Sequence, residues 1–147
     1  MAMKRTKTPW MPADAYGRSF KPALGVNLLV RDVARSVAFQ TDVIAAEAVY
    51  CDEDFAAMRF AGSQWMVHAD HAYLDHPMTG IVGGTQTRGA GVEIRIYGRN
   101  PDAAEAAARA ADHIVLAGAI DKPHGLREAF IIDPDGYVWV PGVAIGP

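Results

Sequence analysis

The sequence lacks the features that several classes of protein require. It holds one cysteine, Cys51, so neither an internal disulfide nor a cysteine-based zinc site is available. No stretch approaches the roughly 20 consecutive apolar residues of a membrane-spanning helix. The N-terminus has charged residues but lacks the apolar core of a secretion signal. From the absence of such signals we expect a cytoplasmic protein with no membrane partner.

Basic residues and serines are also scarce. The 14 Lys and Arg residues against 17 Asp and Glu residues give a formal net charge of −3, whereas a protein that binds a phosphate backbone normally presents a basic field. We therefore expect no nucleic-acid partner, and we interpret Lys4, Arg5 and Lys7 as a solvated tail. No serine lies in a Gly-x-Ser-x-Gly motif, so the sequence has no serine-hydrolase signature.

Apolar residues are plentiful. They make up 50% of the 147 residues, which is enough for the core of one domain or of two half-domains that share it. Residues 1–22 combine prolines and scattered aromatic residues without the period of a helix or a strand, and we predict an extended N-terminal arm there. The aromatic side chains of this arm could pack across the domain or onto a second subunit. Residues 23–147 form the predicted domain.

The domain repeats one order of elements. In residues 23–72 the apolar pattern predicts a strand, a helix that begins after Asp32, and three short strands. A polar, glycine-rich linker covers residues 73–89. Residues 90–143 again predict a strand, a helix and three strands, the last two of which form a closing hairpin. The sequence therefore indicates an internal duplication of one structural module.

Two segments carry a resemblance to a known family. Asn27–Phe39 has the sequence NLLVRDVARSVAF, and Ile132–Tyr137 has the sequence IDPDGY, in which proline and glycine suit a tight turn. These segments are similar to the opening strand and helix and to the closing hairpin of the vicinal oxygen chelate superfamily. That superfamily includes glyoxalase I, bleomycin-resistance proteins, extradiol dioxygenases and fosfomycin-resistance enzymes. The resemblance covers residues 24–143.

The resemblance implies a particular α+β fold. Two tandem βαβββ modules would form an open curved sheet around a cavity, with the helices on the outer faces. Members of the superfamily are commonly homodimers, and their cavities often lie at a subunit or module interface. The resemblance therefore leads us to expect a homodimer that holds a small-molecule ligand.

The positions that hold a divalent metal in this superfamily are poor in donors here. The resemblance places them at Gly25, His68, Gly91 and Val140, of which only the histidine has a side chain that can bind a metal. Zinc needs three or four protein ligands, and harder ions rely on carboxylates and water. We therefore expect no metal site of the superfamily type and no cofactor.

A second cluster of possible metal ligands lies at the end of the last strand of the first module. His68, Asp70 and His71 lie close in sequence, with His76 nearby. On a strand His68 and Asp70 would share a face while His71 would point away, and His71 and His76 fall in the linker region. A strand end with polar surface residues is the alternative that we favour.

The same strand phase predicts which side chains face the cavity. A small-molecule site usually combines a few convergent polar groups with apolar and aromatic walls. The residues expected to face the cavity are Asn27, Met66, His68, Glu93, Arg95, Tyr137 and Trp139. The last two of these depend on the register of the closing hairpin.

Several of these side chains have a structural alternative. Glu93 and Arg95 lie two residues apart on one face, where they could form an ion pair or act as a base and a carboxylate clamp. His68 could be held by hydrogen bonds within the cavity wall or could contact a ligand. Trp139 is more often a core residue than a ligand platform.

The loop before the closing hairpin adds two candidates. His124 and Arg127 lie in a loop that commonly rims the cavity in this superfamily, and a histidine can exchange protons near neutral pH. Arg127 could equally pair with Glu128 or Asp121 at the surface. The predicted ligand-binding set is therefore Asn27, His68, Glu93, Arg95, His124, Arg127 and Trp139.

Three functions fit this sequence. The favoured hypothesis is a metal-independent small-molecule-binding protein of the bleomycin-resistance type, with an aromatic or cationic ligand in the cavity of a dimer. The alternative is a lyase, isomerase or dioxygenase with a divalent metal or with an atypical site at His68, Glu93 or His124. A protein-interaction module is the third possibility. Fold similarity supports the enzyme by analogy alone.

Overall fold

A computed structural model describes residues 8, 10–72, 76–82 and 87–146. The elements of the first half are α1 (Ala13–Arg18), β1 (Asn27–Val30), α2 (Val33–Asp42), β2 (Glu47–Cys51), β3 (Phe55–Phe60) and β4 (Ser63–Ala69). A 3-10 turn (Asp70–Ala72) and the short helix α3 (Thr79–Val82) follow. The second half contains β5 (Glu93–Tyr97), α4 (Pro101–Ala110), β6 (Ile114–Asp121), β7 (Leu126–Ile132) and β8 (Val138–Ala144). The predicted tail residues Lys4, Arg5 and Lys7 lie outside the described residues.

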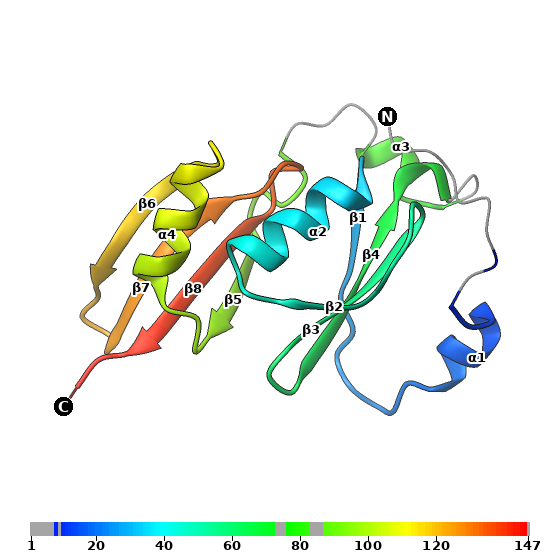
Figure 1. Cartoon of the computed structure of the whole chain (residues 1–147), viewed down its shortest axis with the longest axis horizontal. Helices are drawn as coiled ribbons and strands as arrows, with labels where there is room; N and C mark the ends of the chain where they lie inside the picture. The colour runs from blue at the N-terminus through cyan, green and yellow to red at the C-terminus, as the bar shows by residue number, and fades with distance from the viewer. Residues whose placement is uncertain (1–7, 9, 73–75, 83–86, 147) are drawn as a thin grey trace.

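The strands form two sheets of the same design (Figure 1). The first sheet has the strand order β1-β4-β3-β2 and the second has the order β5-β8-β7-β6. In each sheet the first strand of the module pairs in parallel with the last, and the other pairs are antiparallel. The duplication and the α+β fold of two tandem βαβββ modules are therefore confirmed.

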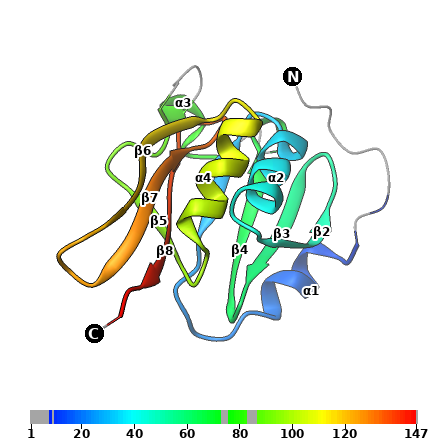
Figure 2. The same cartoon turned by 60° about the vertical axis from the view of Figure 1, so that its left-hand side comes forward.

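One long helix packs against each sheet. The Asp32 side chain caps α2 by accepting from the N–H of Arg35 at 3.1 Å, and Asn100 caps α4 by accepting from two N–H groups. Pro101 occupies the first turn of α4, where its missing N–H costs no hydrogen bond. The two helices contact each other, as Figure 2 shows. Within the described ranges no helix is long and apolar enough to cross a membrane.

The core fills the space between the helices and the sheets. The ring of Phe39 lies 6.2 Å from that of Trp139, which in turn lies 5.9 Å from that of Trp65. The buried polar groups in this layer are paired with one another. Trp65 Nε1 donates to Gln40 Oε1 at 2.9 Å, and Gln40 Nε2 donates to Ser36 Oγ at 3.0 Å. These hydrogen bonds offset the cost of burying the indole and the amide.

The arm contains a helix that its sequence did not indicate. α1 is six residues long, and an ion pair of 2.7 Å between Asp14 and Arg18 spans it. The sequence predicts an extended arm here because a helix of only six residues is too short to show a helical period. The predicted linker at 73–89 likewise contains α3, and the rest of its course lies partly outside the described residues.

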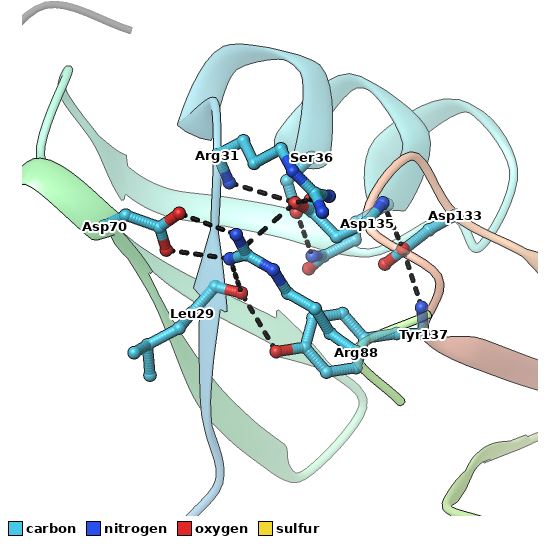
Figure 3. A network of polar contacts seen from close by, with 9 residues as sticks. Leu29, Arg31, Ser36, Asp70, Arg88, Asp133, Asp135 and Tyr137 are labelled. Atoms are coloured by element: carbon cyan, nitrogen blue, oxygen red, sulfur yellow. Dashed lines mark hydrogen bonds and ion pairs between the residues drawn. The ribbon is translucent and has the colours of Figure 1, made fainter. Parts of the chain in front are cut away.

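A network of charged groups joins the two modules (Figure 3). The Arg88 guanidinium makes two hydrogen bonds of 2.7 Å to Asp70 and one of 3.1 Å to the Leu29 carbonyl oxygen of β1. Its Nη1 lies 4.0 Å from Asp135 in the turn between β7 and β8. Asp135 also accepts from the backbone N–H of Arg31 at 2.9 Å. Because the Arg88 side chain is only 1% exposed, this network is a buried junction between the modules.

Candidate functional site

A pocket of about 370 Å³ lies on the first sheet. Its sheet side chains come from two neighbouring rows of the β-ladder. One row contains Asn27, Met66 and Tyr50, and the next contains His68 and Phe55. Alternate residues on these strands, such as Leu28 and Val67, are buried in the core with α2. The pocket therefore opens on the face of the sheet turned away from α2.

The N-terminal arm supplies the opposite wall. The residues that it contributes are Trp10, Met11, Ala13, Tyr16, Gly17 and Phe20. We call this space the arm pocket, because the arm and the first sheet together enclose it.

Aromatic rings hold the arm against the sheet. Trp10 stacks on Tyr50 with ring centroids 5.1 Å apart and an interplanar angle of 17°. Tyr16 meets Phe55 edge to face at 5.2 Å and meets Phe20 at 4.8 Å. Burial raises the pKa of Tyr16, so its hydroxyl stays protonated at neutral pH. Of the two arrangements left open by the sequence, the arm aromatics pack across the domain.

A histidine and an asparagine form the polar part of the arm pocket. His68 Nδ1 lies 2.6 Å from Asn27 Oδ1. An amide oxygen can only accept a hydrogen bond, so Nδ1 carries the proton and the neutral ring has its unprotonated nitrogen at Nε2. The His68 ring also packs on Phe55, with centroids 4.8 Å apart. The register of β1 against β4 puts the two polar side chains at diagonal positions of one face.

Three other predicted residues gather on the second sheet. Arg95 forms ion pairs with Glu128 and, at 3.3 Å, with Glu93. His124 Nε2 lies 3.4 Å from Glu128 Oε2. The Glu128 side chain is only 3% exposed, so Arg95 neutralises a buried carboxylate. The ion-pair alternative for Glu93 and Arg95 is therefore present, and this cluster lies on a different sheet from the arm pocket.

Two predicted site residues have other surroundings. Trp139 is fully buried, and its Nε1 donates to Asp133 Oδ2 at 2.9 Å. Its assignment to the cavity face is wrong, because it lies in the same row as the core residue Ile131, on the face that packs against α4. Arg127 binds Asp102 through two hydrogen bonds of 2.8 Å and Asp121 through one of 3.0 Å. It thus forms a surface ion-pair cluster, and it does not line the arm pocket.

Tyr137 belongs to the junction between the modules. Its hydroxyl donates to the Leu29 carbonyl oxygen at 2.9 Å. Its ring also lines a groove of about 730 Å³ between the modules, to which Glu93 and Arg95 contribute. Burial raises the pKa of Tyr137 to about 12, so the hydroxyl remains a hydrogen-bond donor.

The described residues do not fit the divalent ion that the resemblance implies. Gly25 and Gly91 precede β1 and β5 and have no side-chain donor, and Val140 is 1% exposed and apolar. Within the described part of the chain no three His, Cys, Asp or Glu residues are placed to hold a metal. In the alternative cluster, Arg88 binds Asp70, and His71 Nε2 lies 2.9 Å from Asp54. Small-molecule binding without a metal stays a prediction.

Sequence reasoning missed most of the aromatic lining. Tyr50 and Phe55 lie on the same face as Met66 and His68, but the phase of their short strands was not used. The arm residues had only one signal, which was the concentration of aromatic side chains in a segment without a period.

Comparison with known proteins bears on the fold. No protein-family model and no curated protein sequence matches the chain. Among solved structures, a glyoxalase/bleomycin resistance protein/dioxygenase family enzyme from Burkholderia phytofirmans PsJN is 16% identical, with a TM-score of 0.67 over 82% of this chain and 97% of that chain. A glyoxalase/bleomycin resistance protein/dioxygenase from Nocardioides is 20% identical, with a TM-score of 0.60 over 90% and 92%.

A third similar structure is TioX from Micromonospora sp. ML1, at 18% identity and a TM-score of 0.59, over 85% of this chain and 98% of that one. At these identities the comparisons show similarity of fold. The repeated strand order of the two modules is consistent with that similarity. The protein therefore shares its fold with these solved structures of glyoxalase/bleomycin resistance protein/dioxygenase type, as the resemblance of its sequence predicts.

Proposed function

We propose that the protein binds a small molecule in the arm pocket and does so without a metal ion. The observation that carries this proposal is the lining of the pocket. Five aromatic side chains, two of them tyrosines, surround the hydrogen-bonded pair of Asn27 and His68 in about 370 Å³. Small-molecule sites typically occupy about 300–1,000 Å³ and combine apolar walls with a few fixed polar groups.

The positions of the other charged groups support the same proposal. Arg95, Glu128 and Arg127 are engaged in ion pairs on the second module. The charged residues Asp70 and Arg88 hold the modules together. The polar chemistry in the arm pocket is therefore that of a neutral binding site, in which His68 and Asn27 orient a ligand.

A thermal-shift screen tests the proposal. The full chain is screened against a metabolite panel in EDTA, and again with zinc or manganese added. We expect at least one compound to raise the melting temperature equally with and without metal. Stabilisation that appears only with a metal would instead favour the lyase, isomerase or dioxygenase alternative. A complete lack of stabilisation by any compound would overturn small-molecule binding and favour the protein-interaction module.

Substitutions in the polar pair connect the screen to the site. His68→Ala and Asn27→Ala should leave folding intact, since both side chains are only part-buried, and should weaken binding about tenfold through a lost hydrogen bond. Tyr97→Ala is the matched control, because Tyr97 is 64% exposed on β5 and lies outside the arm pocket. Unchanged ligand affinity in His68→Ala would remove His68 from the site.

We also propose that a second copy of the chain covers β6, the edge strand of the second sheet. Ile114, Leu116 and Ile120 of this strand are 62%, 61% and 54% exposed. Contiguous exposed apolar side chains on a soluble domain mark an interaction surface. Light scattering should give the mass of a dimer for the wild-type chain and of a monomer for Leu116→Asp. A monomeric wild-type protein at micromolar concentration would contradict this assembly.

A further inference from the structure

We infer that the ligand of the arm pocket is an uncharged, planar aromatic molecule with one hydrogen-bond acceptor. This inference rests on the proposed function and specifies the chemical class of the ligand. It follows from the shapes of the walls, from the charges near them and from the polar pair of Asn27 and His68.

The walls are flat and present both faces and edges of rings. Trp10 and Tyr50 stack nearly parallel, whereas Tyr16 stands edge-on to Phe55 at an interplanar angle of 76°. Aromatic rings bind other rings best in offset-stacked or edge-to-face arrangements. Because these wall rings contact one another, we expect a ligand ring to pack on the faces and edges that they leave toward the pocket. A saturated ring of the same volume would fill the space but would lose this stacking.

Among the residues that the structure describes, the lining contains no Asp, Glu, Lys or Arg. Two charged side chains beside the lining segments, Asp52 and Arg18, are engaged with other groups. Asp52 accepts from the Tyr50 hydroxyl at 2.6 Å and from the backbone N–H of Asp54 and Phe55. Arg18 is paired with Asp14. A charged ligand would therefore lose its hydration without gaining a counter-ion, which is costly in an apolar site.

The polar pair sets the hydrogen bond that the ligand must make. Asn27 Oδ1 accepts from His68 Nδ1, so the Asn27 amide offers its N–H donors to a ligand. The complementary group on an uncharged aromatic molecule is a hydroxyl oxygen, a carbonyl oxygen or a ring nitrogen. Such a hydrogen bond distinguishes strongly between ligands with and without an acceptor, because a ligand that lacks the acceptor leaves the Asn27 N–H donor unpaired.

A matched series of two-ring compounds tests separately whether the ligand must be uncharged and whether it must be planar. The full chain is titrated by calorimetry in EDTA at neutral pH with naphthol, naphthoate, naphthylmethylammonium and decahydronaphthol. Naphthol should bind about tenfold or more tightly than both ions and than the saturated alcohol. Trp10→Ala and Asn27→Ala should each weaken naphthol binding several-fold, whereas Trp10→Phe and the control Tyr97→Ala should leave it nearly unchanged.

The other outcomes overturn the inference. Tighter binding of the ammonium would show that the rings act as a cage for a cation. Tighter binding of the carboxylate, equal binding of the saturated alcohol, or no binding by any member of the series would also contradict it. The proposed function fails by a different result, which is the absence of any stabilising compound in the metabolite screen. A compound from the metabolite screen whose binding depends on His68 would support ligand binding in the arm pocket, even if the naphthol series does not bind as expected.

Discussion

At the scale of single residues, Asp133 joins the closing turn to the core. Its Oδ1 accepts from the backbone N–H groups of Asp135 and Tyr137 at 2.9 and 3.0 Å, and its Oδ2 accepts from Trp139 Nε1 at 2.9 Å. Burial raises the pKa of Asp133 to about 6, although these three donors act in the opposite direction. The turn that carries the family resemblance is thus also a titrating site.

This raised pKa predicts a loss of stability at higher pH. The ordinary pKa is 3.8, so between about pH 4 and pH 6 the folded state holds a proton that the unfolded state releases. The stabilisation present below the unfolded value is lost as the pH rises through about 6, and a two-unit difference corresponds to up to ~3 kcal/mol. Asp133→Asn removes this contribution.

Urea unfolding of both proteins at several pH values checks the prediction. The free energy of unfolding of the wild type relative to Asp133→Asn should decline between about pH 4 and pH 7. A difference that stays constant, or that grows with pH, would show that Asp133 is ionised throughout this range.

At the scale of elements, the junction around Arg88 connects the two sheets to the candidate site. Arg88 binds Asp70, which lies two residues after His68, and the carbonyl oxygen of Leu29, which is the register partner of His68. The Arg88 backbone N–H also donates to the Asp135 carbonyl oxygen at 3.1 Å. One buried side chain thus fixes the ends of β1 and β4 and the turn of the second module.

Removing this guanidinium should destabilise the protein strongly. Arg88→Ala leaves Asp135, whose side chain is 3% exposed, and the Leu29 carbonyl oxygen without this donor, at a cost of ~3 kcal/mol in the free energy of unfolding. Arg109→Ala is the control, because Arg109 is 61% exposed in its ion pair with Glu105 and should cost less than ~0.5 kcal/mol. Equal losses in the free energy of unfolding for the two substitutions, measured with denaturant, would contradict the stabilising role of Arg88 at this junction.

At the scale of the whole molecule, the fold could be predicted more fully than the site. Capped helices, alternating strands and the Asp133–Gly136 turn are local signals, and each recurs or matches a known pattern. The hairpin register was not determined by such signals. The resemblance placed Val140 at a metal position and the strand phase placed Trp139 on the cavity face, yet neighbouring residues of a strand point to opposite faces. The structure assigns Trp139 to the core.

The arm pocket depends on contacts that leave no periodic trace in the sequence. Trp10 meets Tyr50, and Tyr16 meets Phe55, across about 40 residues of chain. Such a contact is decided by shape and burial, so the sequence could indicate only that the arm aromatics pack somewhere. Asn27 and His68, in contrast, were predicted on one face, because strand phase is a local property.

The most direct test is to locate a bound ligand by NMR in EDTA, with any compound that stabilises the protein. We predict that the chemical-shift changes on ligand binding cluster at the Trp10 indole, Asn27, Tyr50, Phe55 and His68, and that added zinc does not alter them. Chemical-shift changes centred on Glu93 and Arg95 of the second sheet, or changes that appear only after a metal is added, would contradict metal-independent binding in the arm pocket.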